Sequence, residues 1–453
     1  MTKEGSLEAP TREPIAWRDP DFTDAEKLDA EMRRVFDICH GCRRCFNLCD
    51  SFPRLFDLID NGPTEELDGV KSEEFPAIVE ACTLCDMCFM TKCPYVPPHA
   101  FNLDFPHLML RYRAAEAKAG KSDFTQRQLA QMDRNGRLAA IAAPIVNWAS
   151  AKGNALTRPL MEMTVGIDRD AQLPKFHTRT FMAADRGDPI SPNENAPAFG
   201  KRKAAIFATC FVNYNKPSTG MAARAVLNHI GVETRAAYPG CCGMPFLEQA
   251  QLDRVAEQAV KVSKELVKLI DEGYDIVTPT ASCGLMLKFE WALIVPENED
   301  VKRLAEHVYD IDEYVVDVAK NEGLPPLESL PEGVTVHIPC HARAQNMGPK
   351  AAEMLRLIPE TPVDVIERCS GHGGTFGVVK QTHGVAVKVG RPVYRQVVAQ
   401  ARGHIASDCP LAGLHIVENS KALAEKEGKT IAPKAEHPIE ILARAFGLLE
   451  HLS

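Results

Sequence analysis

Long hydrophobic runs are missing from this chain. A helix that spans a membrane needs about 20 consecutive apolar residues. The longest candidate, Leu138 to Val146, is much shorter and contains Pro144. The first residues, Met1 to Pro20, are polar and proline-rich, without the apolar core of a secretory signal. We therefore expect no transmembrane helix and a cytoplasmic location.

An excess of positive charge is also missing. The 453 residues include 52 Lys and Arg against 61 Asp and Glu, which gives a formal net charge of −9. Proteins that bind nucleic acids usually concentrate positive charge on one face, so we expect no nucleic-acid partner. A content of 45% hydrophobic and 25% charged residues is typical of a globular protein, and the length corresponds to about three domains.

A separate glycine-rich phosphate loop is the third missing feature. The stretch Gly371-His-Gly-Gly374, with Gly377, has the composition of such a loop. It directly follows a cysteine that we consider below as a metal ligand, so a turn around that site is the simpler interpretation. We therefore expect no flavin or NAD in this chain and assign these cofactors to a partner.

Cysteine, in contrast, is abundant, with fifteen residues. In a reducing cytosol such a number argues against disulfides and for metal or redox chemistry, because iron–sulfur clusters and zinc select soft thiolate ligands. Eight of the cysteines form two runs: Cys39, Cys42, Cys45 and Cys49, and then Cys82, Cys85, Cys88 and Cys93, with Pro94 following.

The spacing within the two runs predicts a pair of [4Fe-4S] clusters. Three cysteines in steps of three let one loop bind three irons, and in two-cluster ferredoxins the distal cysteine binds the other cluster. The expected assignment is therefore crossed. The first cluster takes Cys39, Cys42, Cys45 and Cys93, and the second takes Cys82, Cys85, Cys88 and Cys49. Structural zinc is the alternative, although zinc sites favour two CxxC pairs separated by a longer loop.

Two details depart from the bacterial ferredoxin pattern. Asp50 follows Cys49 where proline is usual, and four residues rather than three precede Cys93. Arg43, Arg44 and Lys92 lie beside the cysteines and could offset the charge of anionic clusters, although surface solvation is the simpler role for each of them.

From Lys201 onward the pattern changes to alternating strands and helices, which predicts mostly parallel sheets. The expected strands of the first half are 204–208, 232–238 and 274–278, and those of the second half are 334–338, 363–367 and 404–407. Helices are expected between them, including Leu252 to Asp271, which has helical periodicity.

The remaining cysteines follow the same repeat. Cys210, Cys241 and Cys283 are separated by 31 and 42 positions, and Cys340, Cys369 and Cys409 by 29 and 40. This agreement suggests duplication of one unit. Each cysteine follows a predicted strand, and ligands of parallel sheets bind at the carboxyl ends of strands. We therefore expect one metal site in each half.

The two sites are not expected to be equal. In the first, Cys242 adds a fourth thiol beside Cys241, and Gly243 allows the sharp turn that this requires. In the second, Ser370 occupies the equivalent position, so only Cys340, Cys369 and Cys409 remain. His341, His372, Asp408, a substrate or water could complete that site, or it could be empty.

These motifs together resemble a known family. Ala143-Pro-Ile-Val-Asn147, Cys210-Phe-Val-Asn-Tyr-Asn215, Cys241-Cys-Gly243, Pro339-Cys-His341 and Cys369-Ser-Gly371 are similar to the iron–sulfur subunit of anaerobic glycerol-3-phosphate dehydrogenase and to heterodisulfide reductase-related cysteine-rich (CCG) iron–sulfur proteins. The resemblance extends from about Asp37 to Leu449.

The resemblance implies an α+β multidomain fold. An α-helical ferredoxin-like domain with two [4Fe-4S] clusters precedes two duplicated α/β cysteine-rich (CCG-type) domains. The expected division is a flexible tail over 1–30, the ferredoxin-like domain over 31–135, a helical linker over 136–200, and the two cysteine-rich domains over 201–330 and 331–453. The cysteine-rich domains are expected to hold one or two further iron–sulfur clusters or zinc. Met286 and Ala412 replace the last cysteine of the CxxC that often ends the repeat, so a five-thiolate cluster is not supported.

By this resemblance the chain is an electron-transfer subunit rather than a stand-alone enzyme. It would relay electrons from a flavoprotein dehydrogenase to a membrane quinone or another redox acceptor in anaerobic respiration. Three alternatives remain: a catalytic disulfide reductase subunit, a redox partner of a rubrerythrin-type di-iron peroxide reductase, and a zinc-stapled structural scaffold. The apolar stretch Arg137 to Ala155, with Trp148, could make peripheral contact with the cytoplasmic face of the inner membrane, or it could be buried between domains.

Overall fold

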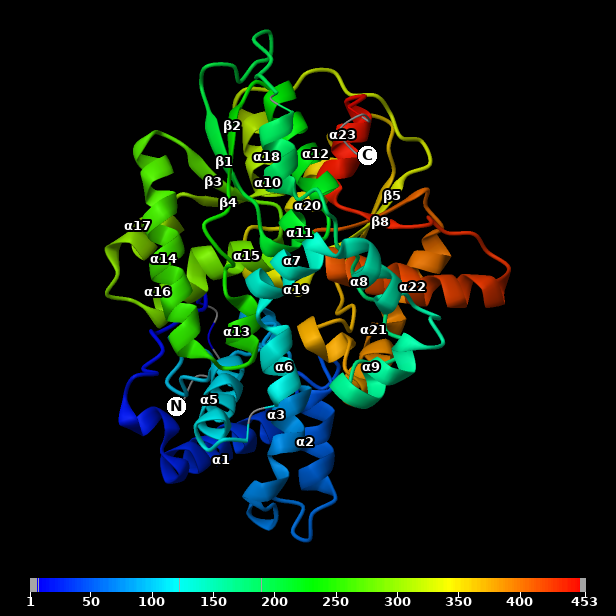
Figure 1. Ribbon diagram of the computed structural model, residues 1–453. Helices are drawn as coiled ribbons and strands as arrows, with labels where there is room; N and C mark the ends of the chain where they lie inside the picture. Colours follow the sequence, from blue (N-terminus) through cyan, green and yellow to red (C-terminus); the bar gives the residue numbers. More distant parts are fainter. Residues whose placement is uncertain (1–5, 7, 122, 189, 449–453) are drawn as a thin grey trace.

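The N-terminal part of the chain is helical and lies below the rest of the molecule in Figure 1. The structure, a computed structural model, describes residues 6, 8–121, 123–188 and 190–448. The N-terminal helices are α1 (Ala25–Cys42), α2 (Ser51–Asp60), α3 (Pro76–Ala81), α4 (Met87–Thr91) and α5 (Phe105–Lys118), with the 3-10 turns η1 (Pro20–Thr23), η2 (Leu67–Gly69) and η3 (Ser72–Glu74). Their core is aromatic, with the rings of Phe52 and Phe105 4.7 Å apart and those of Phe36 and Phe75 5.1 Å apart.

The segment before α1 packs against the rest of the molecule. The Arg12 guanidinium lies 2.8 Å from Asp86, 2.8 Å from Asp104 and 3.1 Å from Glu290, which makes it the centre of a buried ion network. The expected flexible tail over 1–30 therefore differs from the structure over its described residues, since Arg12 is anchored and α1 begins at Ala25. Residues 1–5 and 7 of that tail lie outside the described residues.

Five helices connect the N-terminal part to the first sheet. They are α6 (Phe124–Leu129), α7 (Met132–Ile141), α8 (Ala143–Ser150), α9 (Thr157–Val165) and α10 (Phe181–Gly187). Pro144 lies in the first turn of α8, where its missing N–H costs no hydrogen bond. The stretch that contains the longest apolar run of the sequence is therefore divided into two short helices. No helix in the described part of the chain is long and apolar enough to cross a membrane.

The first α/β unit has a parallel sheet of order β2-β1-β3-β4. Its strands are β1 (Lys203–Phe207), β2 (Glu233–Ala237), β3 (Asp275–Thr278) and β4 (Val308–Asp310), and its helices are α11 (Cys210–Tyr214), α12 (Pro217–His229), α13 (Met244–Glu248), α14 (Leu252–Asp271), α15 (Ala281–Leu285), the π-helix η4 (Met286–Glu290), α16 (Trp291–Ile294), α17 (Glu299–Ala305) and α18 (Ile311–Asn321). The helix predicted over 252–271 is present with those bounds, because Val255, Val262, Leu266 and Ile270 place one apolar face in the core.

The second unit has a parallel sheet of order β6-β5-β7-β8. Its strands are β5 (Val334–His337), β6 (Val363–Ile366), β7 (His404–Ser407) and β8 (Ala435–Glu436), and its helices are α19 (Cys340–Ala344), α20 (Lys350–Leu355), the 3-10 turn η5 (Gly374–Gly377), α21 (Lys380–Gln400), α22 (Pro410–Glu427) and α23 (Pro438–Ala445). The α+β expectation is confirmed, and the three strands predicted in each half are present. The short fourth strands, β4 and β8, were not predicted.

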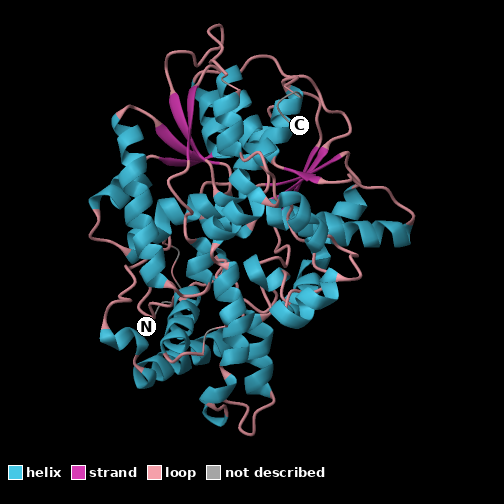
Figure 2. Ribbon diagram, viewed as in Figure 1, coloured by secondary structure: helices cyan, strands magenta, loops and turns pink. Residues whose placement is uncertain are grey.

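The two sheets have corresponding strand orders, which supports the duplication that we propose. They lie side by side in the upper half of Figure 2, surrounded by helices. One continuous hydrophobic cluster joins the two units, with Val226 of α12, Val315 of α18, Leu355 of α20 and Leu442 of α23 among its buried members. The carboxyl ends of both sets of strands therefore stay in fixed positions relative to each other.

Candidate iron–sulfur centres

The first predicted cluster site is a small cavity at the end of α1. Its lining includes the four cysteines predicted for the first cluster: Cys39, Cys42, Cys45 and Cys93. Cys39 and Cys42 lie on the last turn of α1, and Arg43 then adopts left-handed backbone with φ 53°. This bend returns the chain so that Cys45 also faces the cavity. The distal cysteine of the second run thus lies with the first run.

The second predicted site surrounds the loop before α4. Leu84 and Asp86, on either side of Cys85, have φ of 49° and 61°, so the loop curls tightly around its thiols. Cys49 interacts electrostatically with Cys85 and Cys82, and Cys88 interacts with all three. The distal cysteine of the first run thus lies with the second run. Arg113 of α5 donates hydrogen bonds to the carbonyls of Val79, at 2.9 Å, and Cys82.

The chemistry of these thiols fits an iron–sulfur cluster. Burial together with neighbouring thiols raises the pKa of Cys39, Cys49 and Cys88 well above the ordinary value. Burial also raises the pKa of Cys45 to about 12 and that of Cys82 to about 11. Such thiols ionise readily only when a cation binds them and displaces their protons. Four soft donors around each site are the ligand set of a [4Fe-4S] cluster.

The first cysteine-rich site brings together all four of its predicted residues. Sγ of Cys241 lies 3.8 Å from Sγ of Cys210, and Sγ of Cys283 lies 3.3 Å from Sγ of Cys242. Side-chain hydrogen bonds with Cys210 and Cys242 lower the pKa of Cys241. These residues follow β1, β2 and β3, so the parallel sheet places them at one edge.

Three groups outside the cysteines hold this site in shape. Gly243, with φ 84°, makes the turn after the paired cysteines. The buried indole of Trp291 donates to the Cys242 carbonyl at 2.9 Å. Asp133 of α7 accepts from the backbone N–H of Cys241 at 3.1 Å and from the Tyr238 hydroxyl. A cavity lined by Cys241, Asp133, Arg137 and Arg254 opens beside the site.

The second cysteine-rich site also brings its three cysteines together. Cys340 interacts electrostatically with Cys369 and Cys409, and burial raises the pKa of both neighbours to about 11. Its distinguishing contact is with the N-terminal part: the Cys340 thiol donates to Cys85, which lowers the pKa of Cys85 and raises that of Cys340. The second cluster site and the second cysteine-rich site therefore share a boundary.

The three protein groups considered as a fourth ligand of this site each have a buried polar atom without a hydrogen-bond partner in the part of the chain that the structure describes: Nε2 of His341, Nε2 of His372 and both carboxylate oxygens of Asp408. His341 Nδ1 lies 3.0 Å from the Ser282 hydroxyl. His372 is buried, which lowers its pKa to about 3, and its ring lies 5.9 Å from that of His415. Burial and the neighbouring Asp408 carboxyl raise the pKa of Asp312. Among the described residues, no three His, Cys, Asp or Glu side chains are arranged around a single metal-ion position.

Two features of these sites were not found by sequence reasoning. The contact between Cys85 and Cys340 joins residues 255 positions apart in the sequence, and no spacing rule links the two runs to the later repeat. Arg12 likewise lies in a stretch with no recognisable motif, although its partner Asp86 lies within the second run and its partner Asp104 lies after it. Only the fold reveals either relation.

The comparisons with known proteins agree with this chemistry. Residues 204–288 match the family of the cysteine-rich domain, CCG. The chain is 28% identical over 321 residues to a subunit of the anaerobic glycerol-3-phosphate dehydrogenase of Escherichia coli (strain K12), which covers 70% of this chain and 76% of that protein. It is 31% identical over 216 residues to lactate utilization protein A of Geobacillus kaustophilus, covering 45% and 82%. It is also 29% identical over 232 residues to a subunit of the fumarate reductase (CoM/CoB) of Methanothermobacter marburgensis, covering 50% and 43%.

The fold and the grouped thiols define a cysteine-rich iron–sulfur protein. More particularly, the chain belongs to the cysteine-rich (CCG) iron–sulfur family that includes the iron–sulfur subunit of anaerobic glycerol-3-phosphate dehydrogenase.

Proposed function

We propose that the chain is an electron-transfer subunit with two [4Fe-4S] clusters in the ferredoxin-like domain over 31–135. The observation that carries this proposal is the exchange of distal cysteines. Cys93 lines the cavity of the first run and Cys49 interacts with the thiols of the second. Bound clusters would supply one-electron redox chemistry, and the chain's burial and hydrogen bonds would set their potentials.

The proximity of the thiol groups supports an order of transfer. Cys45 of the first site interacts with Cys88 of the second, and Cys85 of the second contacts Cys340 of the second cysteine-rich site. Electrons would pass along this series of neighbouring centres. We propose a metal centre, most simply a further iron–sulfur cluster, at Cys210, Cys241, Cys242 and Cys283, and a less complete one at Cys340, Cys369 and Cys409.

The relatives support the choice of partners. Three of them are named as part of a glycerol-3-phosphate dehydrogenase, as a lactate utilization protein and as part of a fumarate reductase. We propose a flavoprotein dehydrogenase as electron donor and a membrane quinone as acceptor. The cysteine-rich domains are proposed to occupy 201–330 and 331–453, with a helical linker over 136–200; residues 449–453 lie outside the described residues.

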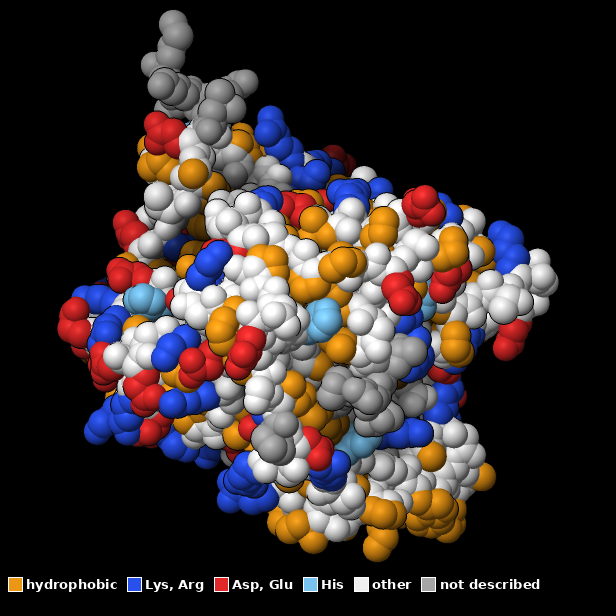
Figure 3. Space-filling view, turned by 90° about the horizontal axis from the view of Figure 1, so that it is seen from above, with side chains coloured by type: hydrophobic (Ala, Val, Ile, Leu, Met, Phe, Trp, Pro, Cys, Tyr) orange, Lys and Arg blue, Asp and Glu red, His pale blue; other side chains and the backbone are white. Residues whose placement is uncertain are grey.

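An apolar patch on the linker supports peripheral membrane contact. We define the patch as seven side chains, each more than half exposed: Leu138, Ile141, Ile145, Trp148, Leu156, Leu160 and Met163. Hydrophobic side chains gather at the lower edge of the molecule in Figure 3, which corresponds to the front of Figure 1, where α7, α8 and α9 lie. Exposed Trp and Leu on short helices are typical of a segment that lies in a membrane interface.

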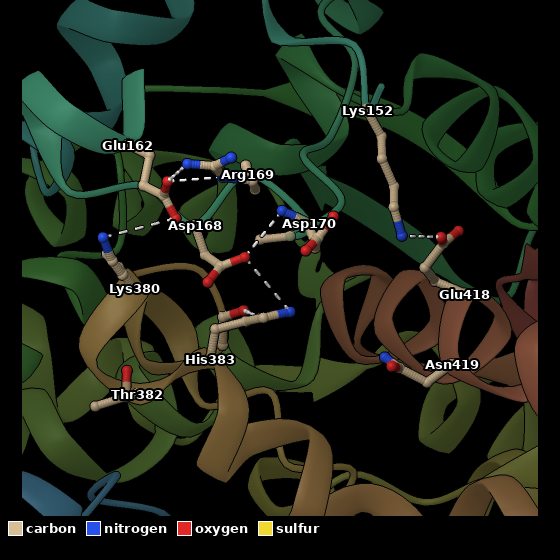
Figure 4. A network of polar contacts seen from close by, with 12 residues as sticks. Lys152, Glu162, Asp168, Arg169, Asp170, Lys380, Thr382, His383, Glu418 and Asn419 are labelled. Atoms are coloured by element: carbon tan, nitrogen blue, oxygen red, sulfur yellow. Dashed lines mark hydrogen bonds and ion pairs between the residues drawn. The ribbon is translucent and has the colours of Figure 1, made fainter. Parts of the chain in front are cut away.

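Ion pairs fix the opposite side of this segment on the second unit. Lys152 pairs with Glu418 of α22, and His383 of α21 lies 3.9 Å from Asp168, as Figure 4 shows. Glu162 of α9 also faces Lys380, at 4.0 Å. The polar side of the linker is therefore attached to the protein, which leaves the apolar patch for the bilayer.

A ligand-exchange experiment tests the cluster proposal. After anaerobic purification we expect about eight iron atoms for the two cubanes, and electron paramagnetic resonance signals on reduction. Cys42→Ala and Cys93→Ala should remove the same signal, and Cys85→Ala and Cys49→Ala the other. If Cys49→Ala removes the signal that Cys42→Ala removes, the crossed assignment is wrong. Protein with zinc and no iron would end the proposal.

Vesicle sedimentation tests the membrane contact. Ile145→Glu combined with Trp148→Glu should reduce sedimentation with vesicles of phosphatidylethanolamine and phosphatidylglycerol by about tenfold, because two charges enter the apolar patch. Val260→Glu changes an exposed apolar residue of α14 outside the patch and should leave sedimentation unchanged. Equal loss in both variants would contradict a specific role of the patch.

A further inference from the structure

A cavity of about 480 Å³ lies where the three parts of the molecule meet. The N-terminal part supplies Cys82, Thr83, Tyr112 and Arg113; the first α/β unit supplies Glu248; and the second supplies Phe376. The volume lies within the range of about 300–1,000 Å³ that small-molecule sites have. Because Cys82 belongs to the second predicted cluster site, a molecule in this cavity would be in contact with that site.

Two glycines allow a loop of the second unit to pack closely against residues that line the cavity. A Cβ on Gly374 would lie 2.4 Å from Oε2 of Glu248, and one on Gly373 would lie 2.6 Å from Cγ2 of Thr83. Both residues also have left-handed backbone, with φ of 58° and 56°. Side chains at these positions would push the units apart, so the two glycines let this loop pack closely against Glu248 and Thr83 beside the cavity.

Arg113, another residue that lines the cavity, connects two parts of the molecule through hydrogen bonds. Its guanidinium donates to the carbonyl of Glu248 at 3.1 Å, to that of Val79 at 2.9 Å, and to that of Cys82. One cation therefore joins the second cysteine run to the first α/β unit through backbone carbonyls.

The uncharged groups of the cavity favour a flat ligand with carbonyl oxygens, and Glu80, Arg113, Glu116, Lys121 and Asp123 add charged side chains to its lining. Burial raises the pKa of Glu248 to about 7, against the opposing effect of Arg113. Its carboxyl is therefore substantially protonated near neutrality and can donate a hydrogen bond. Gln126 adds a neutral amide donor, and Tyr112 and Phe376 add aromatic surface, whereas the hydroxyls of Thr83 and Thr382 already bond to Cys85 and to the Phe376 carbonyl. This combination suits a flat ring that carries carbonyl groups.

The cavity is adjacent to the apolar patch. Val379 lines the cavity and forms an antiparallel bridge with Ile167, immediately after α9. The backbone N–H of Lys380 also donates to the Gly166 carbonyl at 2.8 Å. Figure 4 shows Thr382, another lining residue, beside the ion pairs of this junction. A ligand dissolved in a membrane would thus be near the cavity when the patch is in contact with the bilayer.

We propose that this cavity binds the quinone ring that accepts electrons from the cluster held by the second cysteine run, with Glu248 as the residue that donates a proton to it. The proposal rests on the proposed function. The ring gains two electrons, one at a time, from reduced iron–sulfur clusters, which become oxidised. One ring oxygen gains a proton as the O–H bond of Glu248 breaks, and the opposite ring oxygen gains a proton from solvent at the cavity rim, near Lys121 and Asp123, which also returns a proton to Glu248. One quinone and two protons become one quinol.

Binding is tested first, on the oxidised holoprotein, by calorimetric titration with menadione, a quinone ring without a long lipid tail. Ala117 of α5 lines the cavity, whereas Ala119, two residues later, is exposed and does not line it. Ala117→Trp should weaken binding by about tenfold or more because it fills the cavity. Ala119→Trp should bind as the wild type does. Equal binding by both variants would overturn the site, provided that both retain the cluster signals.

Proton donation is tested with Glu248→Gln, which keeps the shape of the side chain but cannot release a proton. Menadione binding should change by less than about twofold, while the rate of menadione reduction by the dithionite-reduced protein should fall by about a hundredfold. Glu306→Gln, an exposed change on the first unit, is the control. An unchanged rate in Glu248→Gln would overturn the role of Glu248 as proton donor.

Failure of the proposed function can be distinguished from failure of this inference. If the proposed function fails, the protein has no cluster signals and reduces neither menadione nor ferricyanide. If only this inference fails, reduction of ferricyanide remains intact.

Discussion

The two α/β units have corresponding sheets but different thiol sites, and the difference lies in what surrounds each site. In the first unit four cysteines lie together, with sulfur–sulfur distances of 3.3 and 3.8 Å between neighbours, and Trp291 closes the site from within the same unit. In the second unit Ser370 stands beside Cys369, and the nearest further thiol, Cys85, belongs to the N-terminal part. One topology can thus hold a thiol group that a single unit provides and a thiol group that also contacts a neighbouring domain.

This comparison suggests different roles for the two sites. The first lies beside an open cavity and contains four thiols that all belong to one unit. The second adjoins the second cluster site, so its properties depend on contacts between domains. The predictions below remove or exchange the features that distinguish them, beginning with the largest effect.

Exchanging cysteine and serine at positions 242 and 370 should reverse the difference in iron content between the two α/β units. Cys242→Ser removes one of four thiolates and should abolish the first centre, with a loss of about four iron atoms if that centre is a [4Fe-4S] cluster. Ser370→Cys is the converse change and should increase the iron bound by the second unit. Iron and sulfide analysis after anaerobic purification measures both. Unchanged iron in Cys242→Ser would mean that the first site holds no cluster.

Breaking the Arg12 network should weaken the junction that the second site depends on. Arg12→Met leaves Asp86, Asp104 and Glu290 without their shared cation, and loss of one partner of a buried ion pair costs about 3–5 kcal/mol. The free energy of unfolding in urea measures the loss. Asp86 lies between Cys85 and Cys88, so the signal of the second cluster should change more than that of the first.

Arg18→Met, at an exposed ion pair with Glu297, is the control for the Arg12 variant, with an expected cost below about 1 kcal/mol. Similar losses in both variants would contradict the role given to the buried network.

Removing the hydrogen bond between the Trp291 indole and the Cys242 carbonyl should destabilise the first unit. Trp291→Phe removes the hydrogen bond to the Cys242 carbonyl and leaves space in a fully buried position. An unsatisfied buried carbonyl and a small cavity together cost about 2–4 kcal/mol. Urea unfolding should show that loss, with faster loss of iron from the first site on exposure to a chelator. Trp17→Phe, at a partly exposed indole that donates to the Ile294 carbonyl at 2.8 Å, should cost less and leave the chelation rate unchanged. A chelation rate equal to the wild type in Trp291→Phe would refute the proposed closure.

Much of this architecture could be predicted from sequence, for identifiable reasons. A glycine lies one or two residues before four of the six predicted strands, namely Gly231, Gly273, Gly333 and Gly403, so the positions of these strands follow from local sequence. The short strands Val308–Asp310 and Ala435–Glu436 have too few residues to show any period, and only pairing with β3 and β7 defines them.

The candidate sites divide in the same way. Cysteine spacing indicates which thiols share a site, because the ligands of a cubane are local in sequence except for one. The contact between Cys85 and Cys340, and the position of Glu248 at a cavity between domains, depend on how three domains pack. No local pattern encodes that packing.

The fourth strands provide the smallest contrast between the units. Glu436 of β8 accepts from His404, at 3.0 Å, and from Arg444, at 2.8 Å, and despite its burial these partners lower its pKa to about 2. Burial instead raises the pKa of Asp310 of β4 to about 6. A lowered carboxyl pKa stabilises the fold above the unfolded pKa of about 4.5, and that contribution is lost as pH falls toward 2. A raised pKa has the opposite effect, because the stability of the fold decreases as pH rises from about 4 to 6.

At pH 7, Glu436→Gln should therefore lower the free energy of unfolding by about 1–2 kcal/mol. Asp310→Asn, which can still cap α18, should raise it by about 1 kcal/mol. Urea unfolding at pH 4.5 and pH 7 measures both, and the gain in Asp310→Asn should disappear at the lower pH. A loss of stability in Asp310→Asn at pH 7 would show that this carboxyl is needed in its charged form, and the contrast between the two strands would then be wrong.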